Sequence, residues 1–216
     1  MKRFHPRVRV LAAGLSAIAG YVDALGFIAL GGFFVSFMSG NSTRLAVGVA
    51  QASPNALVAA GLIAAFVSGV CLGSVTGRFA RSHQRPVVIG LVSLLLAVAA
   101  LLNALGDRGP ALAVMAVGMG AENAAFEQDG EVRIGLTYMT GALVKVGQGI
   151  AGAFFGGDRL AWAPYLLHWL GLLAGAVAGA LTYSAIGLSG LWFAAIAAAC
   201  LAWSAHGIRH VEDLQP

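Results

Sequence analysis

The sequence predicts an all-α integral membrane protein with about six transmembrane helices, arranged as two inverted three-helix repeats that each contain an interrupted, re-entrant half-helix. Three observations predict this fold: the composition, several apolar stretches of spanning length, and motifs that recur about one hundred residues apart. The 216 residues are 59% hydrophobic and 10% charged, and their mean hydropathy is +0.83. Because soluble domains carry about 25% charged residues, we expect residues 1–216 to form a single membrane domain.

The apolar stretches supply the predicted transmembrane helices. A helix needs about 20 apolar residues to cross the hydrocarbon core of a bilayer. We expect spanning or nearly spanning helices, of which 110–126 is the shortest, over residues 10–30, 56–77, 87–105, 110–126, 160–186 and 188–205.

The basic residues predict the orientation of these helices. With six spans and a cytoplasmic N-terminus, eleven of the thirteen basic residues lie on the cytoplasmic side, and only Arg44 and Arg108 lie outside. This distribution satisfies the positive-inside rule and places both termini in the cytoplasm. The eleven are Lys2, Arg3, Arg7, Arg9, Arg78, Arg81, Arg85, Arg133, Lys145, Arg159 and Arg209.

A model with eight spans is rejected. It would make residues 41–52 and 142–153 cross the membrane, although each has about a dozen residues where ~20 are needed. It would also move Arg78, Arg81, Arg85 and Arg133 to the outside. We therefore interpret the two short segments as re-entrant half-helices, whose irregular starts must be buried in protein or line a cavity.

An internal repeat explains why there are two such segments. The motif GYVDA at 20–24 returns as GAENA at 120–124, and FMSG at 37–40 returns as YMTG at 138–141. Glycines 69, 73 and 77 return as glycines 171, 175 and 179. The repeats cover approximately 10–105 and 110–207. Because three spans per repeat is an odd number, the second copy should be inverted, as in many secondary transporters.

The starts of the half-helices are candidate binding elements. Gly40, Asn41 and a neighbouring serine have the chemistry of a helix start, and a helix N-terminus at membrane depth attracts anionic or dipolar groups. Two such ends could together hold one small ligand or line a pore, or these side chains could only cap short helices. The candidate residues here are Ser39, Gly40, Asn41, Arg44, Thr140, Gly141 and Lys145, where Arg44 and Lys145 would strengthen the positive potential.

Asp23 is the candidate coupling residue, because a carboxylate within a span costs roughly 2.5 kcal/mol or more and should face the interior with a partner. We consider Arg44, Lys145 and the amides of the half-helices as its partners. Asp23 could carry a coupling proton or cation, or it could form a structural ion pair. Its counterpart Asn123 cannot titrate, and Glu122 points about 100° away from Asn123 on a helix.

Several other classes of function are not indicated. The net charge of +4 belongs to residues at helix ends rather than to a nucleic-acid surface. The histidines have no metal-ligand spacing, and no catalytic or cofactor motif is present, so we expect neither an enzyme nor a cofactor. The recurring glycines favour helix packing, and the same faces could join copies of the chain in a homo-oligomer.

The motifs around Asp23, Ser39–Asn41, Asn123 and Thr140 resemble the YoaK-like family of bacterial multi-pass membrane proteins, a domain of unknown function. The usual family pattern has Met-Thr-Gly-Asn in the first half and Gln-Asn-Ala in the second. Here Ser39 replaces the threonine and Glu122 replaces the glutamine. The resemblance implies a bacterial inner-membrane location and supplies no substrate.

These observations lead to one functional expectation and one alternative. We expect a small transporter or channel-like permease for a small polar or anionic solute, with proton coupling through Asp23 as a hypothesis. Apart from this ligand, the expected partner is the lipid bilayer. The alternative is a membrane scaffold or sensor that transports nothing, in which the polar residues only specify the fold.

Overall fold

The computed structural model describes residues 5–128, 131–132 and 134–212, and it is built almost entirely of helices. This confirms the all-α class predicted from the apolar composition. The elements are α1 (Pro6–Ala29), α2 (Met38–Ala50), α3 (Asn55–Ala80), η1 (Arg81–His83), α4 (Gln84–Ala104), α5 (Arg108–Glu122), η2 (Asn123–Phe126), β1 (Glu127–Gln128), β2 (Glu131–Val132), α6 (Met139–Phe154), α7 (Ala163–Ile186), η3 (Gly187–Gly190) and α8 (Leu191–Glu212).

The long helices occupy the predicted spans. Within the described residues, three helical stretches are long and apolar enough to cross a membrane: Pro6–Ala29, Asn55–Ala104 and Ala163–Gly207. The second comprises α3 and α4, which the chain joins through Arg81 at φ 48°, and the third comprises α7 and α8, joined through Gly187 at φ 60°. Helix α5 has 15 residues, about 22 Å of helix, which is short for a complete crossing.

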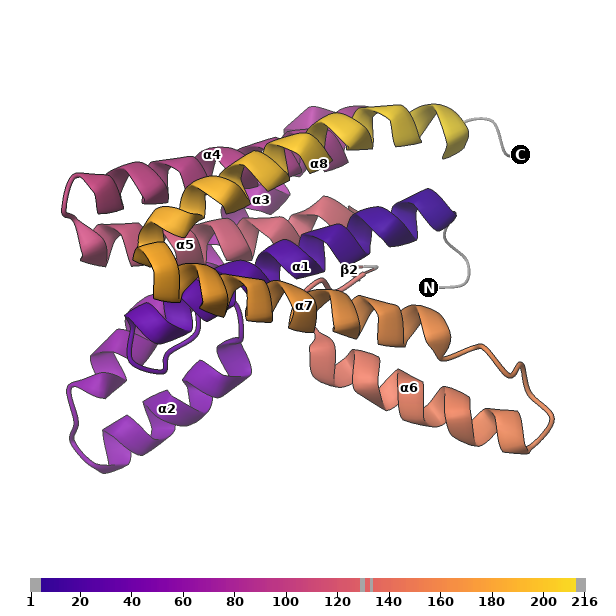
Figure 1. Cartoon of the computed structure of the whole chain (residues 1–216), viewed down its shortest axis with the longest axis horizontal. Coiled ribbons are helices and arrows are strands. Elements are labelled where there is room, and N and C mark those ends of the chain that lie inside the picture. Colours follow the sequence, from indigo (N-terminus) through magenta and orange to yellow (C-terminus); the bar gives the residue numbers. More distant parts are fainter. Residues whose placement is uncertain (1–4, 129–130, 133, 213–216) are drawn as a thin grey trace.

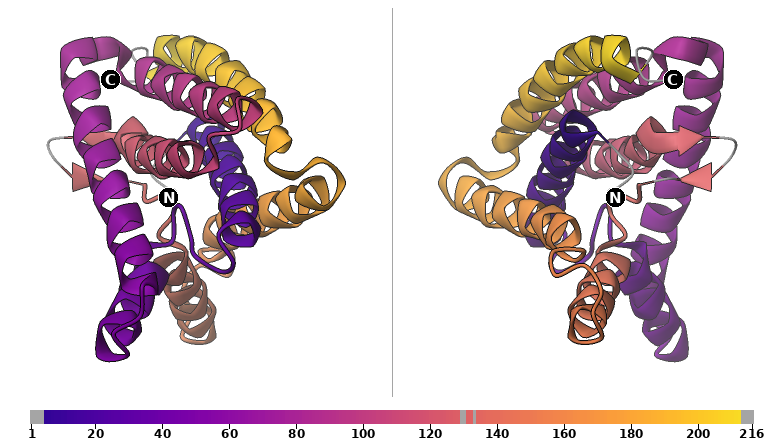
Figure 2. Two further views of the ribbon diagram at one scale, coloured as in Figure 1. Left: turned by 90° about the vertical axis from the view of Figure 1, so that its left-hand side faces the viewer. Right: turned by 90° about the vertical axis from the view of Figure 1, so that its right-hand side faces the viewer.

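The helices pack in pairs that correspond between the two halves of the chain. Helix α1 packs on α7 and α5 packs on α3, while α2 packs on α3 and α6 on α7. Helices α4 and α8 pack on each other. Figure 2 shows α3 and α7 on opposite sides of the central pair α1 and α5. This pairing agrees with two equivalent halves, and their inverted orientation in a membrane stays a prediction.

Glycines make the closest of these contacts. A Cβ atom on Gly20 of α1 would collide with the Leu172 carbonyl oxygen of α7, and one on Gly120 of α5 would collide with the Phe66 carbonyl oxygen of α3. Gly69 and Gly175 are equally close to α5 and α1. Because these glycine faces are already covered within one chain, a homo-oligomer would need another surface.

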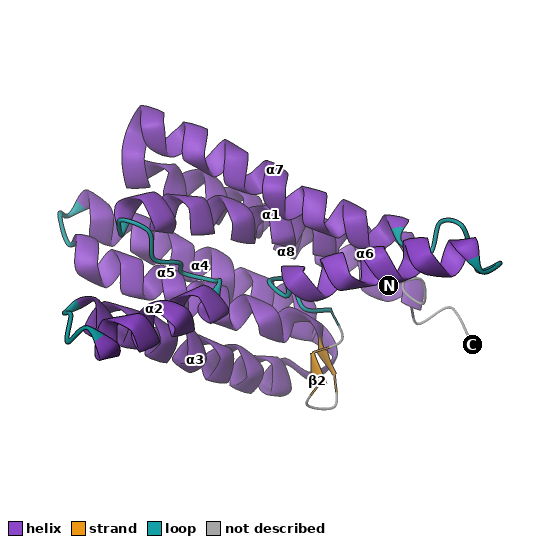
Figure 3. Ribbon diagram, turned by 90° about the horizontal axis from the view of Figure 1, so that it is seen from below, coloured by secondary structure: helices purple, strands orange, loops and turns teal. Residues whose placement is uncertain are grey.

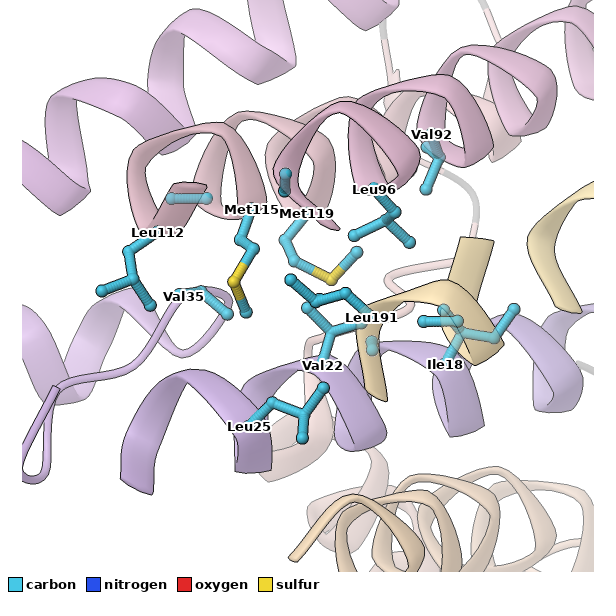
Figure 4. Close-up of a cluster of buried hydrophobic side chains, with 14 of the residues drawn as sticks. Ile18, Val22, Leu25, Val35, Val92, Leu96, Leu112, Met115, Met119 and Leu191 are labelled. Carbon is cyan, nitrogen blue, oxygen red and sulfur yellow. The ribbon is translucent and has the colours of Figure 1, made fainter. Parts of the chain in front are cut away.

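The apolar core lies among α1, α4, α5 and α8. In Figure 4, Met115 and Met119 of α5 point toward Val22 of α1 and Leu191 at the start of α8. All four side chains are fully buried. These side chains fill the space between the four helices at high density and remove apolar surface from contact with water or headgroups. Both effects hold the helices together.

Helices α2 and α6 are the two predicted half-helices. They begin beside each other near the middle of the bundle and run toward opposite ends (Figures 1 and 3). Both begin earlier than predicted, at Met38 and Met139 rather than at 41 and 142. A short hairpin, in which Glu127 pairs with Val132, precedes α6 and was not predicted.

The predicted orientation in the membrane depends partly on residues that the structure does not describe. Lys2, Arg3, Arg133 and the side chain of Arg209 lie outside the described residues. Helix α1 begins and α8 ends at the same end of the bundle (Figure 1), which agrees with both termini on one side. Which side faces the cytoplasm stays a prediction.

Candidate functional site

Asp23 lies on α1 beside the irregular segment that leads into α2. Its Oδ1 atom accepts hydrogen bonds from the backbone N–H groups of Val35 and Ser36, each at 2.8 Å. The partners are therefore amides directly before α2 and not a cation. Asp23, Arg44 and Lys145 are all described, and no ion pair joins the carboxylate to either cation. Of the partners considered, the half-helix amides are therefore the ones found, and the alternative of a structural ion pair with Arg44 or Lys145 is not supported.

Asn41 has a different role from the one predicted. Helix α2 starts at Met38 with Phe37 as its N-cap residue, and no side chain caps it. The buried Asn41 amide instead accepts from the Phe34 N–H at 3.0 Å and donates to the Phe34 carbonyl at 2.6 Å. It thus satisfies both backbone groups of a residue outside any helix or strand. The neighbouring Gly40 allows close packing, because a Cβ there would lie 2.6 Å from the Phe37 ring.

The second half repeats this arrangement with different groups. Asn123, at the end of α5, accepts a hydrogen bond from the Thr137 hydroxyl at 3.3 Å and donates to the Met119 carbonyl at 3.0 Å. Thr137 precedes α6 as Ser36 precedes α2. The pairs Asp23–Ser36 and Asn123–Thr137 therefore correspond, and each links the start of a half-helix to the helix that precedes it, α1 or α5.

A further buried pair, which the sequence analysis missed, holds the segment before α6. The Ser16 hydroxyl donates to the Leu136 carbonyl at 2.9 Å and lies 3.1 Å from His168 Nε2, on α7. His168 Nε2 also lies 3.4 Å from the Gly135 carbonyl. The position of His168 within an apolar span was the available signal, since a polar group there needs a partner.

Two adjoining open cavities lie where α2 and α6 begin. The smaller has a volume of about 280 Å³ and is lined by Ser39 from α2 and by Thr140 and Gly141 from α6. The larger, about 590 Å³, lies against α1 and α7 beside the segments that precede α2 and α6, and Asp23 lines it. Four residues line both cavities: Ser36, Phe37, Thr137 and Met139.

Arg44 and Lys145 lie away from these cavities. The Arg44 guanidinium stacks 5.0 Å from the centre of the Phe33 ring and lines a separate cavity of about 160 Å³. The Lys145 ammonium lies 5.1 Å from the centre of the Tyr165 ring. Neither cation lines the two adjoining cavities, and the expectation that both strengthen a positive potential at the half-helix starts stays a prediction.

Glu122 is a buried acid at the end of α5. Its side chain is fully buried, and neither carboxylate oxygen has a hydrogen-bond partner among the described residues. An isolated carboxylate anion is very costly to bury, whereas the neutral acid costs far less. Among the described residues, no group of three or more His, Cys, Asp or Glu side chains could hold a metal ion.

Comparisons with known proteins agree with the resemblance stated above. The family described as a protein of unknown function (DUF1275) matches residues 11–204. A UPF0700 transmembrane protein of Rhizobium meliloti (strain 1021) is 38% identical over 199 residues, which cover 92% of this chain and 86% of the relative. No solved structure matches. The resemblance to the YoaK-like family is confirmed. The transmembrane relative also supports the prediction that this chain is a membrane protein.

Proposed function

We propose that this chain, which belongs to the DUF1275 family of membrane proteins of unknown function, is a small transporter or channel-like permease of the bacterial inner membrane. Its solute site is the pair of adjoining cavities where α2 and α6 begin. Neither the family description nor the name of the relative carries an enzymatic activity.

One observation carries this proposal. Residues from both half-helix starts, Ser39 on one side and Thr140 and Gly141 on the other, line a single cavity. In transporters built from inverted repeats, interrupted helices meet near the membrane midplane and form the substrate site there. Irregular backbone at that depth is tolerated where it lines a cavity or is buried in protein, which is the situation of the segments before α2 and α6.

Asp23 is the residue that we assign to coupling. It lines the larger cavity and is half-buried, so its carboxylate is reachable from the site. Its hydrogen bonds come from neutral amides, so no fixed cation cancels its charge. Gain or loss of a proton here would therefore change the charge seen by a solute. Asn123 cannot do the same, so coupling would use one half only.

A scaffold or sensor that transports nothing is the second candidate, and the hydrogen bonds of Asn41 favour it. This side chain satisfies both backbone groups of Phe34 and is fully buried, so it acts on the fold alone. The two candidates differ in what they predict for the cavities. In a scaffold, a substitution that fills a cavity without disturbing folding leaves function unchanged. In a transporter, the same substitution blocks the solute.

Flux into sealed vesicles tests the proposal. Purified protein is reconstituted, and uptake of glycerol, urea and methylammonium chloride is followed by stopped-flow light scattering. We expect faster uptake of at least one of these solutes than in empty vesicles. Ser39→Trp and Thr140→Trp should abolish this uptake, because an indole fills the smaller cavity. Ser42→Trp is the matched control, because Ser42 is exposed on the same helix and lines neither cavity.

Two results would reject the transport function. Uptake no faster than in empty vesicles for every solute would favour the scaffold. Wild-type uptake in both Ser39→Trp and Thr140→Trp, with folding verified by size-exclusion chromatography, would remove the site from this part of the molecule. In the Asp23→Asn variant we expect intact folding, since the amide oxygen still accepts from Val35 and Ser36, together with loss of any dependence of uptake on a pH gradient.

A further inference from the structure

We propose that the larger cavity binds an organic cation, specifically an ammonium group that carries an apolar or aromatic body. The inference rests on the proposed function, because it names the class of ligand for the same site. It differs from the small polar or anionic solute expected from the sequence.

The charge of the cavity is the first argument. Asp23 is the one ionisable residue among those that line it; Ser36 and Thr137 add hydroxyl groups, and the other lining residues are apolar or glycine. Arg44 and Lys145 contact the aromatic rings of Phe33 and Tyr165 instead. In a low-dielectric surrounding, a lone carboxylate attracts a cation and repels an anion much more strongly than it would in water.

The aromatic wall is the second argument. Phe27, Phe34 and Phe37 line the cavity beside Asp23. The Phe27 and Phe34 ring centres are 4.8 Å apart, and the Phe34 and Phe37 rings meet edge to face at 5.1 Å. The faces of aromatic rings attract ammonium groups through the ring quadrupole, so three phenylalanines beside a carboxylate favour a cation over a neutral or anionic ligand.

The same lining excludes a bare metal cation. Hard cations such as Mg²⁺ and Ca²⁺ need six or more oxygen ligands. Here the lining residues offer one carboxylate, the Ser36 hydroxyl and a Thr137 hydroxyl that already donates to Asn123. An ammonium ion with an apolar body keeps its charge near Asp23 and places its carbon atoms against the phenylalanines, and its apolar groups need no oxygen ligands.

The size and rigidity of the cavity fit a small molecule. Its volume of about 590 Å³ is within the usual range of roughly 300–1,000 Å³ for small-molecule sites. The two amide hydrogen bonds to Asp23 hold the carboxylate in place before a ligand arrives. A preorganised group loses less freedom on binding, which favours affinity. Met139, whose side chain is flexible, can adapt the wall to ligand shape.

Binding to the purified protein in detergent tests this inference without any flux. The probes are benzyltrimethylammonium, neutral benzyl alcohol and anionic phenylacetate, measured by calorimetry and by the shift in melting temperature. We expect benzyltrimethylammonium to bind at least about tenfold more tightly than either other probe. Asp23→Asn should weaken this binding at least about tenfold, and Phe27→Leu about threefold. Asp107→Asn, an exposed carboxylate away from the cavity, should change nothing.

The outcomes separate this inference from the proposed function. Equal binding of the three probes, tighter binding of phenylacetate, or unchanged binding in both Asp23→Asn and Phe27→Leu would overturn the ligand class. If Asp23→Asn fails to fold, the binding measured with Phe27→Leu tests the ligand class. The Phe27 ring is partly exposed, and its removal leaves the hydrogen bonds of Asp23 intact. Specific binding of benzyltrimethylammonium without its uptake into the same reconstituted vesicles would keep the site and reject transport.

Discussion

Asp23 and Asn123 occupy corresponding places in the two halves, but only Asp23 can carry a charge. Both side chains bind the segment that leads into a half-helix, Asp23 through the amides of Val35 and Ser36 and Asn123 through the Thr137 hydroxyl. The structural task is therefore shared, and an amide performs it in the second half. That hydrogen bonding does not require the negative charge of Asp23, so we propose that the charge binds the ligand.

Glu122 gives the first prediction at the scale of single residues. Because both carboxylate oxygens lack a partner in the described part of the chain, replacement by a neutral amide of similar shape removes no hydrogen bond. We expect Glu122→Gln to change the free energy of unfolding by less than about 1 kcal/mol, or to stabilise the protein. Thermal unfolding in detergent, followed by circular dichroism, measures this.

The matched control for Glu122→Gln is Met119→Gln. Met119 is fully buried on the same helix, one turn earlier, and lies in the apolar core. Placing an amide there without partners should cost about 1–3 kcal/mol. If Glu122→Gln destabilises the protein as much as Met119→Gln does, then the Glu122 carboxyl makes a favourable interaction in the folded protein and our interpretation of it is wrong.

At the scale of elements, the sequence predicted the helices that depend on apolar length and missed the details that depend on single polar contacts. The long helices α1, α3, α4, α7 and α8 lie in the predicted stretches, because spanning length depends on composition, whereas α5 is shorter than a full span. The Gly40-Asn41-Ser42 motif, however, suits a helix cap as well as it suits the actual contact, in which Asn41 binds Phe34 seven residues earlier. No local pattern distinguishes these two uses of an asparagine.

The candidate site could be predicted only in part, for a similar reason. The repeat placed Ser39, Thr140 and Asp23 near the half-helix starts, and these residues do line the two cavities. The directions of Arg44 and Lys145 could not be predicted, because each long side chain follows an aromatic ring that only the tertiary fold brings near. The hairpin before α6 and the Ser16–His168 pair depend likewise on tertiary contacts.

Helix pairing gives a prediction at the same scale. Gly69 on α3 faces the Val117 backbone of α5, whereas Gly61 on the same helix has open space around it. Gly69→Ala should therefore force α3 and α5 apart and destabilise by roughly 1–3 kcal/mol. Gly61→Ala should be neutral or stabilise by up to about 1 kcal/mol, because alanine is the better helix former. Chemical denaturation in detergent measures both, and equal effects would contradict the assigned helix contact.

At the scale of the whole molecule, the account depends on how two equivalent halves are placed in the membrane. Helices α1 and α7 form one close pair and α5 and α3 form the other, with α2 and α6 running toward opposite ends of the bundle (Figure 1). If the bundle axis is the membrane normal, the half-helices enter from opposite faces and meet at the cavities. A solute could then reach the same site from either side.

Labelling of single cysteines from each side of the membrane tests this arrangement most directly. Gln51→Cys, directly after α2, and Phe155→Cys, directly after α6, are introduced into a protein lacking Cys71 and Cys200, and both positions are exposed. A membrane-impermeant thiol reagent is applied to intact cells and to inside-out vesicles. The account predicts that Gln51→Cys reacts only from the outside and Phe155→Cys only from the cytoplasmic side. Reaction of both cysteines from the same face would contradict it.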